Sequence, residues 1–321
     1  MDLNLLIILG PTASGKTKVG VEVARVLDGE IISADSRQVY RRMNIGTGKD
    51  LEEYGSVPYH LIDIVDPGYE FNVFEFQRYF IEVFAGIQAR GRFPILVGGT
   101  GMYLDAVLRG YRLHEVPENP MLRRELAALA LDNLAARLKG ANPKLHNTTD
   151  LLDRERLTRA IEIAEFSGER KDPPSPFPDI KPIVFGIRLE REILRQRITK
   201  RLRERLNRGM IEEVKELIIK GASFETLEFY GLEYRFVAKF LKGELNRNDM
   251  FQKLNSAIHQ FAKRQETWFR RMERQGIQIH WVDGEKDPAG AILNILERAK
   301  FGPAPWISLA GNSSSQAPKS K

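Results

Sequence analysis

Short apolar runs alternate with helix-period segments over the first 111 residues of the chain. Leu5–Leu9 has the length and composition of a buried strand, and Lys16–Leu27 follows it with apolar residues on one helical face. The same alternation predicts strands at 30–36, 59–65 and 93–97, a single helical turn at 39–43, and helices at 74–87 and 102–108. Strands separated by crossover helices pair in parallel, so the pattern predicts an α/β fold.

The pattern changes at Arg112, after which no strand-like run occurs for about 70 residues. Helical periodicity predicts helices at 121–131, 133–138 and 153–166, and a proline-rich loop at 171–182 precedes a strand at 183–187 that rejoins the sheet. We therefore expect a core formed by residues 1–111 and 166–301, with a helical insertion at 112–165. Residues 302–321 are rich in Ser, Pro and Ala, and their composition predicts a disordered tail.

Basic residues are concentrated in the helices predicted for the C-terminal part. The segment 188–208 contains nine Lys or Arg and three Glu, while Leu194, Ile198 and Leu202 keep an apolar face at i, i+4 spacing. The pattern indicates a helix that packs on the core and exposes its charge. Further helices are expected at 210–219, 249–274 and 289–300, with a last strand at 278–282. A face this basic favours a polyanionic partner over a merely solvated surface.

Composition excludes several kinds of chemistry. The chain has 321 residues, 42% of them hydrophobic, a net charge of +6 and no cysteine. Disulfides, thiolate catalysis and cysteine-bound metals are therefore excluded, and the five histidines lack the spacing of a metal site. No apolar run approaches the roughly 20 residues of a membrane span, and the N-terminus leads directly into a strand rather than a signal peptide. We expect a cytoplasmic protein that does not bind membranes.

The turn after the first strand carries a phosphate-binding motif. Residues 10–17 match G-x-x-x-x-G-K-[ST] at every fixed position, between a predicted strand and a predicted helix. In this motif, which is common among ATP- and GTP-binding proteins, the glycines let backbone N–H groups surround an anion. The lysine adds a positive charge, and the hydroxyl that follows it contacts Mg²⁺. The fold is thus predicted to be a P-loop parallel sheet flanked by helices, and the diphosphate-binding candidates are Gly10, Pro11, Thr12, Ala13, Ser14, Gly15, Lys16 and Thr17.

Two further turns are expected beside this motif, because ligands bind at the carboxyl edge of open parallel sheets. Asp35 ends the second strand, and Gly98–Gly101 ends the fourth with Thr100 inside it. Asp35 or Ser36 could simply cap the next helix, but beside a phosphate-binding turn a catalytic role for Asp35 is favoured. The glycine turn is equally compatible with a ligand contact through Thr100 and with a tight turn of no chemical role.

The residues alone leave the reaction open. Small-molecule phosphoryl transfer is the first hypothesis for a P-loop. However, the most apolar strand ends in glycines and threonine instead of a metal-binding carboxylate, and the basic helices exceed what a metabolite kinase needs. No second signature of a signalling or motor NTPase is present. These observations point to a phosphate-binding core that acts on a nucleic acid.

Seven motifs together resemble those of the tRNA dimethylallyltransferases, also called tRNA isopentenyltransferases. They are GPTASGKT (10–17), SADSRQVY (33–40), NIGTGK (44–49), HLID (60–63), GRFPILVGGTGMYLDAVL (91–108), RERLTRAIEI (154–163) and AKRQETWFR (262–270). The chain departs from the family pattern at Ile258 and His259, where a threonine and an arginine are usual, and at Leu232, where a tyrosine follows the glycine.

The resemblance implies that the loop holds the pyrophosphate of dimethylallyl diphosphate, with Mg²⁺ near Thr17, and that the prenyl group moves to N6 of the adenine at position 37, beside the anticodon. It implies catalytic roles for Asp35 as general base, and for Thr100 and Arg197 or Arg201 at the pyrophosphate. It also implies contacts to the tRNA anticodon stem-loop by Asp35, Ser36, Arg37, Gln38, Thr100, Arg123, Arg156, Arg159, Lys263 and Arg264. We expect a monomer. The alternatives are prenyl transfer to free adenylate and a P-loop small-molecule kinase.

Overall fold

The computed structural model describes residues 3–111, 113, 115–141, 153–169 and 177–299. The predicted tail at 302–321 and residues 171–176 of the predicted proline-rich loop lie outside these residues. Contacts divide the chain into two units, residues 1–111 with 178–321, and residues 112–177. Helix α6 continues past residue 165, the predicted end of the insertion, to Glu169.

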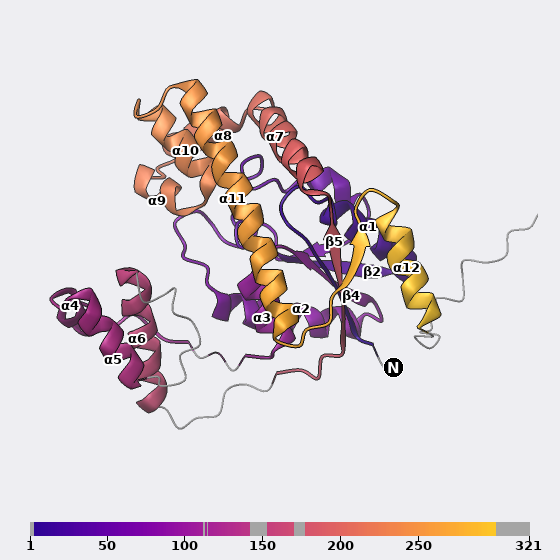
Figure 1. The fold of residues 1–321 in the computed structure, drawn as a ribbon, viewed down its shortest axis with the longest axis horizontal. Helices are drawn as coiled ribbons and strands as arrows, with labels where there is room; N and C mark the ends of the chain where they lie inside the picture. The colour runs from indigo at the N-terminus through magenta and orange to yellow at the C-terminus, as the bar shows by residue number, and fades with distance from the viewer. Residues whose placement is uncertain (1–2, 112, 114, 142–152, 170–176, 300–321) are drawn as a thin grey trace, which may run out of the picture. The chain divides into compact units, whose positions relative to one another are not determined.

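The larger unit is built on one sheet of six parallel strands in the order β3-β2-β4-β1-β5-β6 (Figure 1). The strands are β1 (Leu5–Leu9), β2 (Gly29–Ala34), β3 (Tyr59–His60), β4 (Phe93–Gly98), β5 (Pro182–Arg188) and β6 (His280–Asp283). Strand β1 lies between β4 and β5, and all five of its side chains are buried. Such a strand is apolar throughout, because both faces of a parallel sheet are covered.

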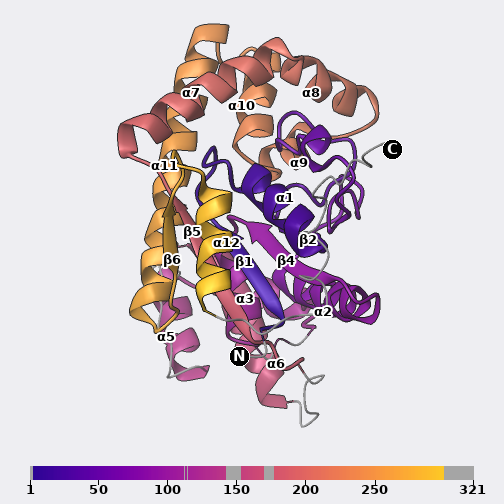
Figure 2. The same ribbon diagram turned by 90° about the vertical axis from the view of Figure 1, so that its right-hand side faces the viewer.

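Helices cover both faces of the sheet and its carboxyl end. Helices α1 and α12 lie on one face, α2, α3 and α11 on the other, and α7, α8 and α10 at the end where the strands terminate (Figure 2). Leu6 and Ile8 of β1 belong to the core beneath α1 and α12. The helices of this unit are α1 (Lys16–Leu27), the 3₁₀ turn η1 (Leu51–Tyr54), α2 (Val73–Ala89), α3 (Gly101–Leu108), α7 (Arg191–Asn207), α8 (Met210–Ile219), α9 (Phe224–Phe229), α10 (Leu232–Leu241), α11 (Arg247–Arg274) and α12 (Pro288–Arg298).

The predicted α/β class and parallel sheet are confirmed, but two local predictions are wrong. The strand predicted at 59–65 stops at His60, because Leu61 and Asp63 have left-handed backbone φ angles of 63° and 55°. The residues predicted as a helical turn at 39–43 form non-helical turns, with Arg42 at a φ of 64°. Neither η1, α9 nor α10 was predicted; η1 and α9 are only four and six residues long.

The smaller unit contains α4 (Pro120–Ala127), α5 (Leu131–Ala141) and α6 (Arg154–Glu169), as the helical periodicity predicted. Buried leucines and an isoleucine form its core: Leu126, Leu134, Leu138, Leu157 and Ile161. The buried carboxylate of Glu162 accepts hydrogen bonds from Arg123 at 2.8 and 3.0 Å and from Arg159 at 3.0 Å. Both arginines thus hold this unit together. Burial raises the pKa of Glu162, but hydrogen bonds from Arg123, the Asn119 N–H and Arg159 outweigh it and lower that pKa to about 2. In the described part of the chain, no helix is both long enough and apolar enough to cross a bilayer.

A buried carboxylate joins β2 to its neighbours. Glu30 accepts two hydrogen bonds from Arg90, which follows α2, at 3.0 and 2.7 Å, and lies 2.6 Å from Nε2 of His60 in β3. The Arg90 hydrogen bonds, with a smaller contribution from His60, lower the pKa of Glu30, although burial opposes them. The ionised form of Glu30 therefore stabilises the fold.

We predict that Glu30→Gln lowers the free energy of unfolding by about 1–3 kcal/mol at pH 7, because charge-assisted hydrogen bonds are lost. Because the pKa of Glu30 is lower in the folded than in the unfolded protein, its ionised form stabilises the fold at any pH above the unfolded carboxyl pKa of about 4.3. This stabilisation is lost as the pH falls from there through the folded-state pKa. Urea unfolding from pH 7 to 3.5 should therefore show the difference from wild type shrinking below about pH 4. A difference that stays constant over this range would contradict the assignment.

Candidate functional site

The loop at residues 10–15 connects β1 to the first turn of α1 and contains strained and buried groups. Ala13 and Gly15 have φ angles of 62° and 88°, which turn the loop backbone toward the helix N-terminus. Ser14 is 2% exposed, and within the described residues its hydroxyl has no hydrogen-bond partner. Lys16 begins α1, with its ammonium 3.4 Å from the carbonyl oxygen of Pro11. A helix N-terminus with a buried hydroxyl and a lysine is suited to an anion.

A cavity of about 380 Å³ lies beside this loop. Thr17 lines it from α1, and Asp50 and Glu53 line it from the region of η1. Its cationic residues come from α1, from α7 and from the residue that follows α7: Lys16, Arg197, Lys200, Arg201, Arg205 and Arg208. Arg197 and Arg201 were predicted candidates and both line the cavity, whereas Lys200, Arg205 and Arg208 were missed. The i, i+4 spacing of Arg197, Arg201 and Arg205 was the signal that could have identified a basic face directed at the loop.

The positive charges in the cavity alter each other's titration. Burial lowers the pKa of Lys16 to about 8, with Asp35 opposing this shift and Arg201 and Arg205 adding to it. Asp50 forms ion pairs with Arg201 and, at 3.3 Å, with Arg208. Burial raises the pKa of Asp50, but these arginines outweigh that effect and lower it. The cavity therefore keeps an excess of positive charge suited to a multiply charged anion.

Asp35 and Thr100 meet at the carboxyl ends of β2 and β4. The Oδ1 atom of Asp35 accepts hydrogen bonds from the backbone N–H groups of Arg37 at 2.8 Å and Gln38 at 3.3 Å, so the carboxylate caps its own turn. The Thr100 hydroxyl oxygen accepts a hydrogen bond from the Ser36 N–H at 3.1 Å. Both backbone bonds to Asp35 use the same oxygen and leave Oδ2 outside them. The geometry is that of a cap, and it is also compatible with proton acceptance by the half-buried carboxylate.

The other candidates on this turn already have contacts within the protein. The buried Gln38 side chain accepts a hydrogen bond from the Ser33 hydroxyl at 3.2 Å and donates one to the Gly48 carbonyl at 3.1 Å. The guanidinium of Arg37 lies 5.5 Å from the centre of the Phe229 ring. Gln38 therefore fixes the position of the turn relative to the loop at residues 44–49.

That loop is held by a carboxylate that the sequence did not single out. Glu213 of α8 accepts hydrogen bonds from the N–H groups of Asn44, Ile45 and Gly46 at 2.7–3.0 Å, and from the Tyr234 hydroxyl at 2.7 Å. Lys49 is 1% exposed and pairs with Asp63. The loop at residues 44–49 therefore supports the site, and the charged side chains of Glu213, Lys49 and Asp63 hold it in place.

Helix α11 attaches to two of the turns through Gln265. Its side-chain oxygen accepts a hydrogen bond from the Thr12 N–H at 2.8 Å, and its amide donates to the Gly99 carbonyl at 2.9 Å. One turn further on, the Trp268 ring fits against Gly101, where an added Cβ would lie 2.3 Å from the ring. Lys263 and Arg264 on the same helix are exposed. Arg156, on α6 of the smaller unit, is also exposed.

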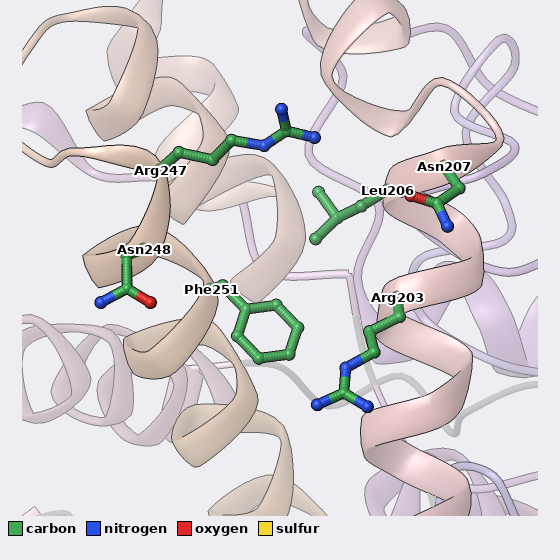
Figure 3. A pocket seen from close by; sticks show the side chains of 6 residues that line it. All are labelled: Arg203, Leu206, Asn207, Arg247, Asn248 and Phe251. Carbon is green, nitrogen blue, oxygen red and sulfur yellow. The ribbon is translucent and has the colours of Figure 1, made fainter.

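A second cavity, of about 490 Å³, lies between α7 and α11 (Figure 3). Arg203 of α7 and Phe251 of α11 point into it, with the guanidinium carbon 5.7 Å from the ring centre. It does not share any lining residue with the cavity beside the Gly10–Thr17 loop. The two cavities therefore use different faces of α7.

Oxygen donors for a divalent cation are present beside the loop. Thr17, Asp50 and Glu53 line the same cavity, whereas the described residues contain no cluster of three or more His, Asp or Glu side chains able to hold a metal alone. Mg²⁺ commonly binds through one or two protein oxygens together with substrate phosphates. The residues present fit a Mg²⁺ ion that arrives with a diphosphate.

Comparisons with known proteins agree in their result. A family model described as IPP transferase matches residues 38–272, and one described as isopentenyl transferase matches residues 3–55. The chain is 69% identical to tRNA dimethylallyltransferase 1 of Geotalea uraniireducens over 92% of this chain and 98% of that protein. It is 65% identical to tRNA dimethylallyltransferase 1 of Geotalea daltonii, covering 95% and 99%. The crystal structure of a Bacillus halodurans tRNA isopentenylpyrophosphate transferase matches with a TM-score of 0.68 and 33% identity, covering 93% and 96%.

We predict that Gln265→Leu lowers the free energy of unfolding by about 2–4 kcal/mol, because the Thr12 N–H and Gly99 carbonyl lose their partner in a buried setting. Urea unfolding measures the change, and Lys263→Ala on the exposed face of the same helix serves as the control, with an expected change within about 0.5 kcal/mol. Equal stability of Gln265→Leu and wild type would show that the bridge is dispensable.

Proposed function

The chain belongs to the tRNA dimethylallyltransferase family, and we propose that it moves a dimethylallyl group from dimethylallyl diphosphate to N6 of adenosine 37 in tRNA. It is a prenyltransferase, since family membership extends over nearly its whole length. The observation that supports the specific reaction best is the cationic cavity beside the Gly10–Thr17 loop, whose Lys16 is close enough to Asp35 for that carboxylate to raise the lysine's pKa. The enzyme acts in the cytoplasm, where its tRNA substrate occurs.

The diphosphate of the donor binds to the backbone N–H groups of the Gly10–Thr17 loop and to Lys16. Arg197 and Arg201 face the same cavity and bind the outer oxygens of the diphosphate. Breaking the allylic C–O bond releases pyrophosphate, and preorganised positive charge stabilises that departure. Mg²⁺ at Thr17, with Asp50 or Glu53, would neutralise part of the phosphate charge.

The acceptor reaction needs a base because N6 must lose a proton. The N6 lone pair of adenine is delocalised into the ring, and the nitrogen gains a bond to carbon as pyrophosphate leaves. Oδ2 of Asp35 accepts the N6 proton while Oδ1 keeps its backbone hydrogen bonds. The adenine is turned out of the anticodon loop to reach this carboxylate. The Thr100 hydroxyl is linked to the same turn by its hydrogen bond from the Ser36 N–H. Asp35, Ser36 and Thr100 therefore contact the adenine together.

Exposed basic residues bind the tRNA backbone. Lys263 and Arg264 project from α11 two turns or less from Gln265 and Trp268, which anchor that helix at the sheet edge. On the insertion, Arg156 is exposed, whereas Arg123 and Arg159 contact the tRNA only with the part of the guanidinium that Glu162 leaves accessible. The protein binds the anticodon stem-loop as a monomer.

Prenyl transfer to free adenylate and phosphoryl transfer by a kinase are the competing activities. Incubation with labelled dimethylallyl diphosphate and bulk tRNA should label tRNA, whereas AMP as acceptor should stay unlabelled. ATP incubated with the protein should remain intact. Label on AMP in preference to tRNA, or phosphate transfer from ATP, would refute the proposed reaction.

We predict that dimethylallyl diphosphate binding weakens as the pH rises above about 8. The pKa of Lys16 is lowered to about 8 by burial, so its side chain is charged below that pH and increasingly neutral above it. Between pH 7 and 9 the affinity of wild type should fall by up to roughly tenfold relative to Lys16→Arg, whose charge persists. Calorimetric titration of both proteins makes the comparison, and parallel pH profiles would exclude a contact between Lys16 and the diphosphate.

We further predict that Asp35→Asn slows single-turnover prenylation of an anticodon stem-loop by about 10²- to 10⁴-fold, the usual contribution of a positioned general base. Asparagine can still accept the Arg37 and Gln38 hydrogen bonds, so dissociation constants for tRNA and dimethylallyl diphosphate should stay within about twofold of wild type. A near-normal rate would leave Asp35 with the cap role alone.

A further inference from the structure

Arg205 combines deep burial with an unused hydrogen-bond donor. The residue is 9% exposed and lines the cavity that Lys16 and Thr17 also line. Within the described residues, its Nε has no hydrogen-bond partner. A guanidinium offers five N–H donors in a planar fork, and a buried donor without a partner is costly. A donor without a partner, on a residue that lines a cationic cavity, indicates a binding site for an anion.

Two contacts hold this guanidinium in place. Its Nη1 atom lies 3.3 Å from Oε1 of Glu233 in α10, whose side chain is 20% exposed. Nη2 lies against the backbone of Gly48, where an added Cβ would be only 1.6 Å away, and the φ of 64° at that glycine also disfavours a side chain. Burial lowers the pKa of Arg205 to about 10, so the group is still a cation at neutral pH.

Other arginines of the cavity form ion pairs with a different carboxylate. Arg201 and Arg208 both pair with Asp50, whereas Arg205 is fixed from the α10 side by Glu233. Its position is thus set by groups outside the loop that it faces. A planar guanidinium binds phosphate oxygens in a bidentate manner, which a lysine cannot do.

We propose that Arg205 is a further diphosphate-binding residue, which Glu233 holds toward the cavity so that its free donors bind the pyrophosphate as it leaves. This inference rests on the proposed function, because it takes the cavity as the diphosphate site. In the reaction, Arg205 acts with Lys16 to stabilise the negative charge that develops when the allylic C–O bond breaks.

The alternative is a buried ion pair that only supports the fold, and a double variant separates the two. Arg205→Met leaves the partly buried Glu233 carboxylate without its partner, so it should lower stability. Arg205→Met combined with Glu233→Gln removes both charges, keeps the net charge of the region and should recover most of that stability. A purely structural pair predicts that the double variant also recovers anion binding.

The experiment is calorimetric titration of the folded full-length protein with inorganic pyrophosphate, alongside thermal unfolding of each variant. We expect both Arg205→Met and the double variant to bind pyrophosphate roughly 10- to 100-fold more weakly than wild type, as loss of a charge-assisted contact implies. Arg203→Met, two residues away on α7 and outside this cavity, is the matched control and should bind as wild type does. A double variant that binds within about twofold of wild type would overturn the proposal.

Lys16→Ala, titrated in parallel, distinguishes this inference from the proposed function. If pyrophosphate fails to bind wild type, or binds Lys16→Ala as tightly as wild type, then the diphosphate site itself is misplaced and both proposals fail. If Lys16→Ala binds weakly while the double variant binds normally, only the role of Arg205 is wrong.

Discussion

Parallel pairing of β2, β4 and β1 sets the constraint on which the site depends. These three strands are neighbours in the sheet and run in the same direction, so the turns that follow them meet at one edge. The register is continuous from β2 through β4 to β1, ending at Ala34, Gly98 and Leu9. Each turn then has a different kind of group to offer: a carboxylate at Asp35, a hydroxyl at Thr100 and a run of backbone N–H groups after Gly10. Hydrogen bonds of Gln265 and Thr100 link these turns to one another. They fix the distances between the turns, which strand pairing alone does not determine.

Helix α7, and not the sheet, supplies most of the positive charge in the cavity beside the Gly10–Thr17 loop. Its apolar residues Leu194, Ile198 and Leu202 are buried, and the residues at the next helical positions, Arg197, Arg201 and Arg205, line the cavity beside the loop. The cations are restrained by carboxylates from separate segments, Asp50 and Glu233. Burial, with a smaller contribution from their mutual repulsion, lowers the pKa values of Lys16 and Arg205. A diphosphate bound as we propose would relieve this repulsion, so the charge distribution favours a multiply charged anion.

Much of this arrangement follows from local sequence patterns. The apolar runs and the spacing from Gly10 to Thr17 determine the strands, the loop and α1, and strand direction then places Asp35 and Thr100 at the same edge. Contacts between distant segments could not be read in this way. Glu213, Glu233 and Gln265 act through partners more than 20 residues away, and nothing adjacent to them in sequence indicates those partners. The spacing of basic residues on α7 predicted a charged face, but the cavity that receives Arg205 depends on how α7 packs beside α10 and the Gly48 loop.

We propose that one edge of the sheet holds a diphosphate beside the Gly10–Thr17 loop and an adenine amine beside Asp35. A crystal structure with an anticodon stem-loop and a thiolodiphosphate analogue of dimethylallyl diphosphate, which resists C–S cleavage, tests it most directly. We expect the diphosphate oxygens within hydrogen-bond distance of the Gly10–Thr17 amides and Lys16, and N6 of the extruded adenine within about 3.2 Å of the Asp35 carboxylate. A diphosphate bound elsewhere, or an adenine amine held by a different carboxylate, would contradict the account.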